Sequence, residues 1–279
     1  MITDILLTIK TVYLLQIKHI MGLINLNLSS NISEIVINNN KRRNSLSSEL
    51  LEKFIAAINR VEKTSSRVLI IRAVSGSKVW SSGFNIEELP VPGVDPVPYN
   101  HPLEKLIRRL QEVKIPVIAM LEGSVWGGAC DLAMSCDILV GTKNTTFALT
   151  PAKIGVPYNS IGIQRILNYM NPNIAKELFF TASPMSAERA FQLGLLNHIV
   201  DTKDIERFTF SLAEDISSNS PLSISVVKRQ IDALSRAKPL AIDVISQIDE
   251  CRNKAYNSED YVEGKLAFQE KRTPNFQGK

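Results

Sequence analysis

Two short segments combine small residues and turns in a pattern that suits the stabilisation of an enolate. They are residues 77–89 (SKVWSSGFNIEEL) and residues 122–131 (EGSVWGGACD), and each follows an apolar, strand-like run. Glycine permits a positive φ and a close backbone approach, so main-chain N–H groups can point outward. Gly127 and Gly128 also open a helical run, whose first N–H groups lack helical partners. Two such N–H groups from separate loops would form an oxyanion hole for a carbonyl oxygen that becomes negative.

Other reaction chemistries lack their usual sequence patterns in this chain. The three cysteines, Cys130, Cys136 and Cys251, show no CxxC spacing, and we expect them to be small buried residues in a reducing compartment. The three histidines lie far apart and offer no HxxxH pair, so no metal site is expected. The chain also has no GxSxG elbow, no P-loop and no GxGxxG after a strand.

The composition is that of an ordinary globular protein. The chain has 279 residues, of which 44 % are hydrophobic and 22 % charged. No apolar run approaches the roughly 20 residues that a membrane helix needs, so we expect no membrane association. The cysteine pattern, typical of a reducing compartment, predicts a cytoplasmic location. The net charge of +4 suits a polyanionic small ligand and is too small to indicate nucleic acid.

Residues 1–20 are treated as an N-terminal extension. They are apolar but contain Asp4, Lys10, Lys18 and His19, so they lack the basic start and unbroken apolar centre of a secretory signal. Arginine and serine are absent from them, which argues against a transit peptide. Met21 stands just before the first alternating segment. The extension is therefore either a misassigned start or an amphipathic addition.

The segment from residue 23 to about residue 140 alternates strand-like and helical patterns. We predict strands over residues 25–31, 34–38, 68–74, 116–121 and 137–142, and helices over residues 44–63, 103–113 and 129–135. Residues 90–102 form a proline-rich loop. Repeating strand–strand–helix units with short links favour an α/β core.

Helical patterns dominate after Pro151. We predict helices over residues 160–170, 174–181, 186–193, 203–217, 222–235, 241–257 and 258–271, with Ser186 and Ser258 as N-caps and Gly194 as a stop. The chain then divides into the extension 1–20, a core over 21–200 and a helical C-terminal region over 201–279. Such a helical tail often packs against another subunit, so we expect an oligomer.

Seven segments resemble the crotonase (enoyl-CoA hydratase/isomerase) superfamily, and the likeness covers about residues 22–279. They are residues 75–79 (SGSKV), 122–129 (EGSVWGGA), 149–151 (LTP), 155–159 (GVPYN), 180–184 (FTASP), 258–261 (SEDY) and 271–276 (KRTPNF). The resemblance is strongest to bacterial decarboxylases of that superfamily. It implies a ββα-spiral core that binds acyl-CoA, a helical C-terminal trimerisation region, and trimers or dimers of trimers. Coenzyme A is then part of the substrate, and no separate cofactor is implied.

The resemblance assigns the two oxyanion-hole N–H groups to Phe84 and Gly128. Hydratases of the family use two glutamates to place and activate water, because hydration needs a positioned proton donor and acceptor. One of these positions is Asp131 here, and the other is Pro151, which has no acid–base group. The resemblance therefore argues against an efficient hydratase.

Decarboxylation needs fewer positioned acid–base groups than hydration does. Loss of CO₂ from a 2-carboxyacyl thioester, such as a methylmalonyl-like one, leaves an enolate that two N–H groups can stabilise. Tyr158 matches the decarboxylases' tyrosine near the reacting carboxylate, where it orients that group or donates a hydrogen bond. The chain departs from the decarboxylase pattern at Phe84-Asn85, which stands in place of His-Asp. The N–H at position 84 remains, and Asn85 either replaces a hydrogen bond or caps the loop.

Coenzyme A carries phosphates and an adenine, so its site needs basic groups near an aromatic face. The resemblance places Lys41, Arg42 and Arg43 at the CoA entrance, Lys78 near the adenine, and Phe268 with Lys271 on a helix that reaches CoA. The predicted substrate- and CoA-binding residues are Lys41, Arg42, Ser45, Leu46, Lys78, Ser82, Asn85, Ile86, Trp126, Gly127, Pro151, Phe268 and Lys271. The predicted catalytic residues are Phe84, Gly128, Tyr158 and Asp131.

The leading hypothesis is a CoA-thioester lyase that decarboxylates a methylmalonyl-like substrate. One alternative is an enoyl-CoA hydratase or isomerase with Asp131 as its only acid, which water addition or proton exchange would reveal. Another is a catalytically silent acyl-CoA-binding protein, which would bind CoA tightly without turnover. Binding of RNA by Lys41-Arg42-Arg43 would require a strong fall in affinity with salt, and three adjacent cations are usually a solvated stretch.

Overall fold

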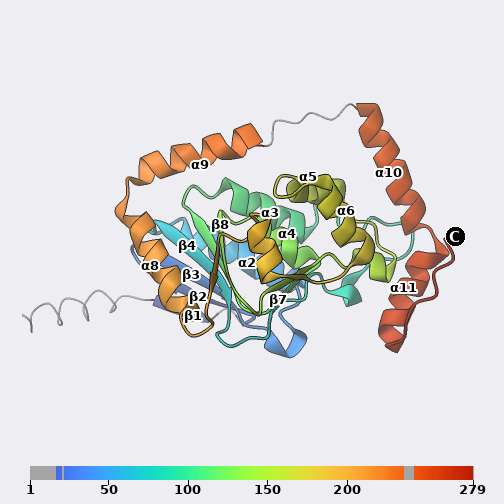
Figure 1. Ribbon diagram of the computed structural model, residues 1–279, viewed down its shortest axis with the longest axis horizontal. Helices are drawn as coiled ribbons and strands as arrows, with labels where there is room; N and C mark the ends of the chain where they lie inside the picture. The colour runs from blue at the N-terminus through green and yellow to red at the C-terminus, as the bar shows by residue number, and fades with distance from the viewer. Residues whose placement is uncertain (1–16, 21, 236–241, 279) are drawn as a thin grey trace, which may run out of the picture.

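Two β-sheets form the centre of the protein, for which a computed structural model describes residues 17–20, 22–235 and 242–278 (Figure 1). The larger sheet consists, in spatial order, of β1 (Ile17–Ile20), β2 (Ile24–Leu28), β3 (Ile32–Ile37), β4 (Val68–Ala73), β6 (Val117–Leu121), β8 (Ile138–Thr142) and β11 (His198–Val200). The smaller sheet consists of β10 (Met185–Ser186), β9 (Thr146–Ala148), β7 (Ser124–Trp126) and β5 (Val79–Ser81). From β3 to β11 the neighbouring strands of the larger sheet are parallel.

The chain repeatedly places one strand in each sheet and then forms a helix. Strands β4 and β5 precede α3 (Pro102–Glu112), and β6 and β7 precede α4 (Gly128–Met134). Strands β8 and β9 are followed by the short 3₁₀ helix η4 (Pro151–Ile154) and α5 (Ser160–Leu167). This repeat confirms the predicted α/β class and ββα-spiral. Because β5 and β7 pair in parallel, the loops that follow them leave the same edge of the smaller sheet.

Helix α2 (Ser48–Val61) shows how local backbone geometry sets an element boundary. The sequence pattern predicted a helix from residue 44, but Asn44 has a positive φ of 52°, which an α-helix does not accommodate. The helix begins after Ser47, whose hydroxyl accepts a hydrogen bond from the N–H of Leu50. The apolar stripe that follows packs on the larger sheet.

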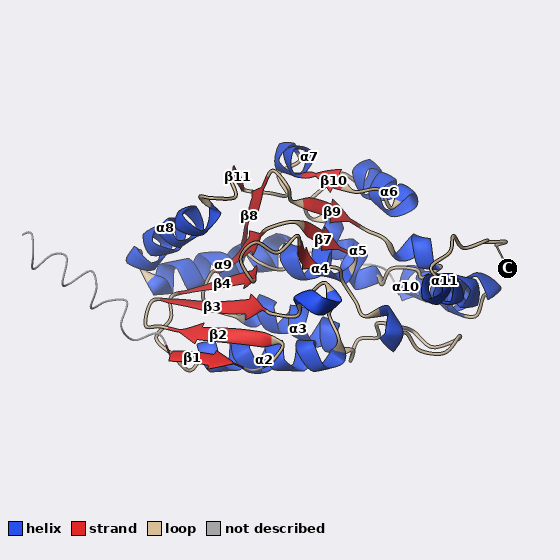
Figure 2. Ribbon diagram, turned by 90° about the horizontal axis from the view of Figure 1, so that it is seen from below, coloured by secondary structure: helices blue, strands red, loops and turns tan. Residues whose placement is uncertain are grey.

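Figure 2 shows the strands of the larger sheet and the helices around it. A hydrophobic core lies on each face of this sheet. The larger core joins one face to α2, α3 and α4, and it contains the fully buried Trp80 and Phe54. The other face is covered by α8 (Ile205–Ser218), where Ile205 and Ala213 pack near Met120. Burial on both faces explains why the central strands read as continuous apolar runs.

The C-terminal half is mainly helical, but it contains two strands that the sequence pattern did not predict. Strand β11 pairs in parallel with β8, and β10 pairs antiparallel with β9. They are three and two residues long, too short for an alternating pattern to show. The remaining helices are α6 (Pro172–Thr181), α7 (Ala187–Gln192), α9 (Pro221–Ser235), α10 (Ile242–Tyr256) and α11 (Glu259–Glu270). Ser186 and Ser258 cap α7 and α11, as predicted.

Helix α11 packs closely against η4, and two glycines permit the approach. A Cβ at Gly264 would lie 2.3 Å from the carbonyl oxygen of Ile154, and one at Gly155 would lie 2.5 Å from the carbonyl oxygen of Asp260. Helix α9 is instead joined to the body by Lys228, whose ammonium lies 2.6 Å from a carboxylate oxygen of Asp137. The C-terminal region is thus attached in three places, by α8 on the larger sheet, by Lys228 of α9 and by α11 on η4.

The segment before β2 contributes to the larger sheet. Strand β1 pairs antiparallel with β2, from Ile17 opposite Leu28 to Ile20 opposite Asn25. Residues 1–16 and Met21 lie outside the described residues, so the predicted nature of the extension stays a prediction. Within the described ranges, none of the helices has the length and apolar content needed to cross a bilayer. Cys130 and Cys136 are buried, whereas Cys251 is exposed on α10, so the expected burial is wrong for that thiol.

Gly123 provides a stability test of the link between β6 and β7. It has a φ of +77°, and a Cβ there would lie 2.1 Å from the carbonyl oxygen of Lys78. Gly76 has a similar φ of +76°, but its Cβ would have nothing within 4 Å. We expect Gly76→Ala to cost about 1–2 kcal/mol of unfolding free energy through φ alone, and Gly123→Ala to cost about 1–3 kcal/mol more through the clash. Urea unfolding measures both, and equal costs would contradict this account.

Candidate active site

The loop after β5 is fixed by a two-bond bridge that leaves one amide pointing away. The N–H of Leu46 donates to the carbonyl of Gly83 at 2.8 Å, and the N–H of Asn85 donates to the carbonyl of Leu46 at 3.3 Å. These two bonds join Leu46 to the residues before and after Phe84. In such extended pairing the intervening N–H points away from the partner, so the N–H of Phe84 faces away from Leu46. It lies 3.7 Å from the position that a Cβ on Gly128 would take.

The second amide belongs to the start of α4. Gly127 has φ 56° and ψ −129°, a conformation outside the helix, and its own N–H donates to the carbonyl of Ala148 at 2.8 Å. Gly128 is the first helical residue, so its N–H has no intrahelical acceptor. Within the described ranges, the N–H groups of Phe84 and Gly128 both lack a hydrogen-bond partner. Together they could hold a negatively charged oxygen.

The two loops touch because Gly83 has no side chain. A Cβ on Gly83 would lie 2.4 Å from the carbonyl oxygen of Trp126 and 3.0 Å from the nitrogen of Gly128. Its φ of +87° is also in the region that favours glycine. Any larger residue would push the two loops apart, and with them the two free amides.

A cleft opens beside these amides. It brings together eight of the predicted residues: Ser82, Phe84, Ile86, Gly127, Gly128, Asp131, Pro151 and Tyr158. Its remaining lining is mostly apolar and comprises Leu89, Pro96, Val97, Leu103, Thr150, Ile154, Val156, Pro157, Asn159 and Tyr256. These ten residues were not predicted from the sequence, because most of them are ordinary apolar residues of loops and helix ends.

The predicted CoA-binding residues outside the cleft fall in two places. Lys41 and Arg42 are exposed in the 3₁₀ helix η2 (Asn40–Arg42), beside the bridge that Leu46 makes, and Lys78 is exposed just before β5. Phe268 and Lys271 are exposed at the end of α11. Ser45, Asn85 and Trp126 are also absent from the lining of the cleft, and Asn85 caps the 3₁₀ helix η3 (Ile86–Glu88) by accepting from Glu87.

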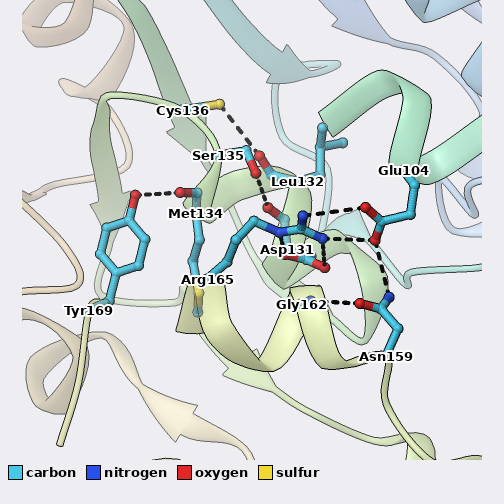
Figure 3. Close-up of polar contacts among 10 residues, drawn as sticks. All are labelled: Glu104, Asp131, Leu132, Met134, Ser135, Cys136, Asn159, Gly162, Arg165 and Tyr169. Carbon is cyan, nitrogen blue, oxygen red and sulfur yellow. Dashed lines mark hydrogen bonds and ion pairs between the residues drawn. The ribbon is translucent and has the colours of Figure 1, made fainter. Parts of the chain in front are cut away.

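Asp131 is engaged in a buried ion network that the sequence did not reveal (Figure 3). Arg165 of α5 donates to both of its carboxylate oxygens, from Nε to Oδ1 at 2.7 Å and from Nη2 to Oδ2 at 2.8 Å. The same guanidinium donates to Glu104 of α3, from Nη2 to Oε1 at 2.8 Å. Asn159 donates to Glu104 at 3.1 Å and, through its side-chain oxygen, caps α5.

Burial dominates the electrostatics of this network. The exposed fraction is 1 % for Asp131, 1 % for Glu104 and 8 % for Arg165. Burial raises the pKa of Asp131 above its ordinary value, and the hydrogen bonds and charge of Arg165 oppose that rise. The pKa of Arg165 is raised by its two carboxylate partners against the effect of its own burial. An arginine within an apolar helix is a signal that could have indicated a buried acidic partner.

Tyr158 lies at the wall of the cleft beside this network. Its hydroxyl is buried beside the carboxylate of Asp131 and makes no hydrogen bond of normal geometry within the described residues. Burial, with a smaller contribution from the negative charge of Asp131, raises the pKa of Tyr158 well above its ordinary value. A buried hydroxyl without a partner is costly, and a bound polar group could supply one.

Helix α10 of the C-terminal region closes one side of the cleft. Arg252 of α10 donates to Asp95 at 2.8 Å and to the hydroxyl of Tyr256 at 2.8 Å. The N–H of Gly93 donates to the carbonyl of Tyr256 at 2.8 Å, which joins the proline-rich loop to α10. Because Pro96, Val97 and Tyr256 all line the cleft, these bonds hold its apolar wall in place.

The comparisons with known proteins agree with this fold and cleft. A family profile described as Enoyl-CoA hydratase/isomerase matches residues 27–279, so the chain belongs to the enoyl-CoA hydratase/isomerase family. It is 42% identical over 247 residues to methylmalonyl-CoA decarboxylase of Escherichia coli strain K12, covering 88% of this chain and 95% of the relative. It is 29% identical to short-chain-enoyl-CoA hydratase of Clostridium acetobutylicum, covering 86% and 92%.

Solved structures extend this similarity. Methylmalonyl-CoA decarboxylase in complex with 2-nitronate-propionyl-CoA matches with a TM-score of 0.90 and 40% identity, covering 92% of this chain and 99% of that chain. The same enzyme with 2S-carboxypropyl CoA matches with a TM-score of 0.91 and 40% identity, covering 94% and 100%. The similarity supports a decarboxylating CoA-thioester lyase of the family. No group of residues that could hold a metal ion occurs in the described part of the chain.

Gly162 tests how closely Tyr158 and Asp131 pack. A Cβ on Gly162 would lie 2.5 Å from Cε1 of Tyr158 and 2.8 Å from Oδ2 of Asp131. Alanine is favoured over glycine within a helix by about 1 kcal/mol, yet we expect Gly162→Ala to destabilise the protein and lower its turnover of thioesters. Thermal unfolding measures the stability effect. A variant as stable as the original protein would show that Tyr158 and Asp131 can shift to admit the added methyl group, and would contradict the close packing described here.

His101 predicts a pH dependence of stability. Its Nδ1 accepts a hydrogen bond from the N–H of Leu103 at the start of α3, and its ring meets the edge of Phe84 with centroids 5.0 Å apart. Burial lowers the pKa of His101, while Glu88 and Asp95 oppose the shift. Its contribution to stability is therefore present above the unfolded-state pKa of about 6.5 and is lost as the pH falls from there toward the lower folded-state pKa.

The variant His101→Asn keeps an N-cap but removes this titration. We expect its unfolding free energy to fall less steeply than that of the original protein as the pH drops below about 6.5. Urea unfolding at a series of pH values measures the slope. The loss of the ring contact with Phe84 lowers stability at every pH, so parallel curves would contradict the assignment to His101.

Proposed function

We propose that this protein decarboxylates a methylmalonyl-CoA-like thioester through an enolate held by the N–H groups of Phe84 and Gly128. The observation that carries the proposal is the convergence of two amides, free within the described residues, on one apolar cleft. The similarity to methylmalonyl-CoA decarboxylase, whose solved complexes contain CoA derivatives, supports the choice of substrate.

The reaction breaks the bond between the substrate's α-carbon and its carboxylate. The electron pair of that bond moves toward the thioester, CO₂ leaves, and the thioester oxygen becomes negative. The amides of Phe84 and Gly128 stabilise this oxygen more than the neutral carbonyl, which lowers the barrier. One proton from solvent then adds to the α-carbon and gives the shortened thioester.

The cleft wall suits the departing carboxylate. Leu103, Val97 and Pro157 offer no charge to the carboxylate, so loss of the charge as CO₂ is favoured there. The Tyr158 hydroxyl, which makes no hydrogen bond of normal geometry within the described residues, donates one that turns the substrate carboxylate out of the thioester plane. Phe84 supplies its amide, while its ring packs against His101.

Contacts with CoA and other copies of the chain complete the proposal. Lys41, Lys78 and Lys271 are exposed cations that would bind the phosphates, whereas Arg42 lies 2.9 Å from Glu87 and would have to exchange that partner. Leu222 and Leu234 of α9 are each 80 % exposed, which supports packing of α9 on another copy of the chain in the proposed homotrimer or dimer of trimers. The cytoplasmic location stays a prediction from the cysteine pattern.

The amide of Gly128 gives the sharpest test of this function. Gly128→Pro removes the N–H at the first helical position, where proline is tolerated. We expect decarboxylation of methylmalonyl-CoA, followed as thioester products by mass spectrometry, to fall about 10²–10³-fold. Glu259→Pro at the first position of α11 is the matched control and should retain activity.

Tyr158→Phe tests the hydrogen bond to the carboxylate. We expect a loss of about 10–100-fold in turnover, the range for a hydrogen bond to a charged group. If folded protein binds CoA but turns over neither methylmalonyl-CoA nor malonyl-CoA, the proposal is wrong and a silent binding protein remains. Hydration of crotonyl-CoA at a comparable rate would instead favour the hydratase alternative.

A further inference from the structure

The carboxylate of Asp131 is placed where a proton-transfer group would be useful. It lines the cleft and lies three residues after Gly128 on α4. Residues three apart share a helix face, so the carboxylate is one turn from the proposed oxyanion donor. A base at this place could remove a proton from the α-carbon of any thioester whose carbonyl bound there.

Arg165 occupies the lone pairs that such a base would use. Its Nε and Nη2 donate to Oδ1 and Oδ2 of Asp131 at 2.7 and 2.8 Å, a side-on contact with both oxygens (Figure 3). A guanidinium in this geometry takes the more basic syn lone pairs of the carboxylate. The lone pairs left are weaker proton acceptors, and the positive charge lowers their basicity further.

Glu104 and Asn159 prevent the guanidinium from turning away. Glu104 accepts from Nη2 of Arg165 at 2.8 Å, and Asn159 donates to Glu104 at 3.1 Å. Arg165 is 8 % exposed, so water cannot readily replace either carboxylate. Gly162 completes the enclosure, because its absent Cβ would lie 2.8 Å from Oδ2 of Asp131. The contact is therefore held from three elements, α3, α4 and α5.

We propose that Arg165 is a positioning residue that withholds Asp131 from proton transfer and so restricts this active site to decarboxylation. The proposal rests on the proposed function for the enolate. A bound thioester with an α-carboxylate reaches the enolate by losing CO₂. A bound thioester without one keeps its α-proton, because no side chain among the described residues that line the cleft is free to take it.

The test compares α-proton exchange with decarboxylation in the full-length protein. Propionyl-CoA is incubated in D₂O at mildly alkaline pH, and deuterium at the α-carbon is followed by mass spectrometry. The variant Glu104→Gln/Arg165→Met removes one negative and one positive charge and leaves Asp131 without its partner. The titratable groups then facing Asp131 are the Tyr158 hydroxyl and the Cys130 thiol.

We expect the double variant to exchange the α-proton at least about tenfold faster than the original protein. Adding Asp131→Asn to that variant should return exchange to the original rate, which a merely structural role of Arg165 would not explain. Arg165→Lys, which keeps the charge but cannot contact both oxygens in the same plane, should give an intermediate rate. CoA binding confirms that each variant is folded.

The outcomes separate this inference from the proposed function. Exchange that is no faster in the double variant, or that persists after Asp131→Asn, would overturn the role of Arg165. If the original protein does not decarboxylate methylmalonyl-CoA but the double variant exchanges faster and Asp131→Asn reverses this, the proposed function is wrong, and Arg165 still withholds Asp131 from proton transfer.

Discussion

The contact between Gly83 and the backbone around Gly128 is the constraint on which the site depends. A Cβ at Gly83 would lie 2.4 Å from the carbonyl oxygen of Trp126, so no other residue permits the two loops to meet. Parallel pairing of β5 with β7 brings the loops to one sheet edge, and the bridge to Leu46 turns the Phe84 amide toward the start of α4. Two donors from segments about forty residues apart in the chain thereby face one point without any side chain taking part.

The buried charges around Asp131 serve a different purpose from the amides. Two carboxylates and one guanidinium are removed from water, and such groups seldom contribute net stability beyond that of well-packed apolar residues. Their geometry is specific, however, because Arg165 contacts Asp131 and Glu104 at once. Loss of Arg165 would leave two buried carboxylates without a counter-charge, so its contacts fix α3, α4 and α5 relative to one another. The cleft wall that carries Tyr158 and Asn159 depends on that fixed spacing.

The sequence predicted the parts of the site that local chemistry determines. Glycines at positions 83, 127 and 128 indicated two turns with outward amides, and the structure places all three at the meeting of the loops. The ion network was missed because Glu104 and Arg165 are 61 residues apart, and no local sequence pattern indicates that α3 and α5 lie side by side. Strands β10 and β11 were missed because they are too short to show an alternating pattern. They are strands only because β10 pairs with β9 and β11 pairs with β8. The helix predicted from residue 44 began later, because a positive φ at Asn44 and the cap at Ser47 override the apolar period.

The central claim is that the amides of Phe84 and Gly128 polarise a bound thioester carbonyl. Infrared difference spectroscopy with propionyl-CoA carrying ¹³C at the thioester carbonyl measures this directly. We expect the carbonyl stretch of the bound thioester to lie at lower frequency than that of free propionyl-CoA, because two hydrogen bonds weaken the C=O bond. A bound thioester whose carbonyl stretch is unchanged from the free molecule would contradict the account.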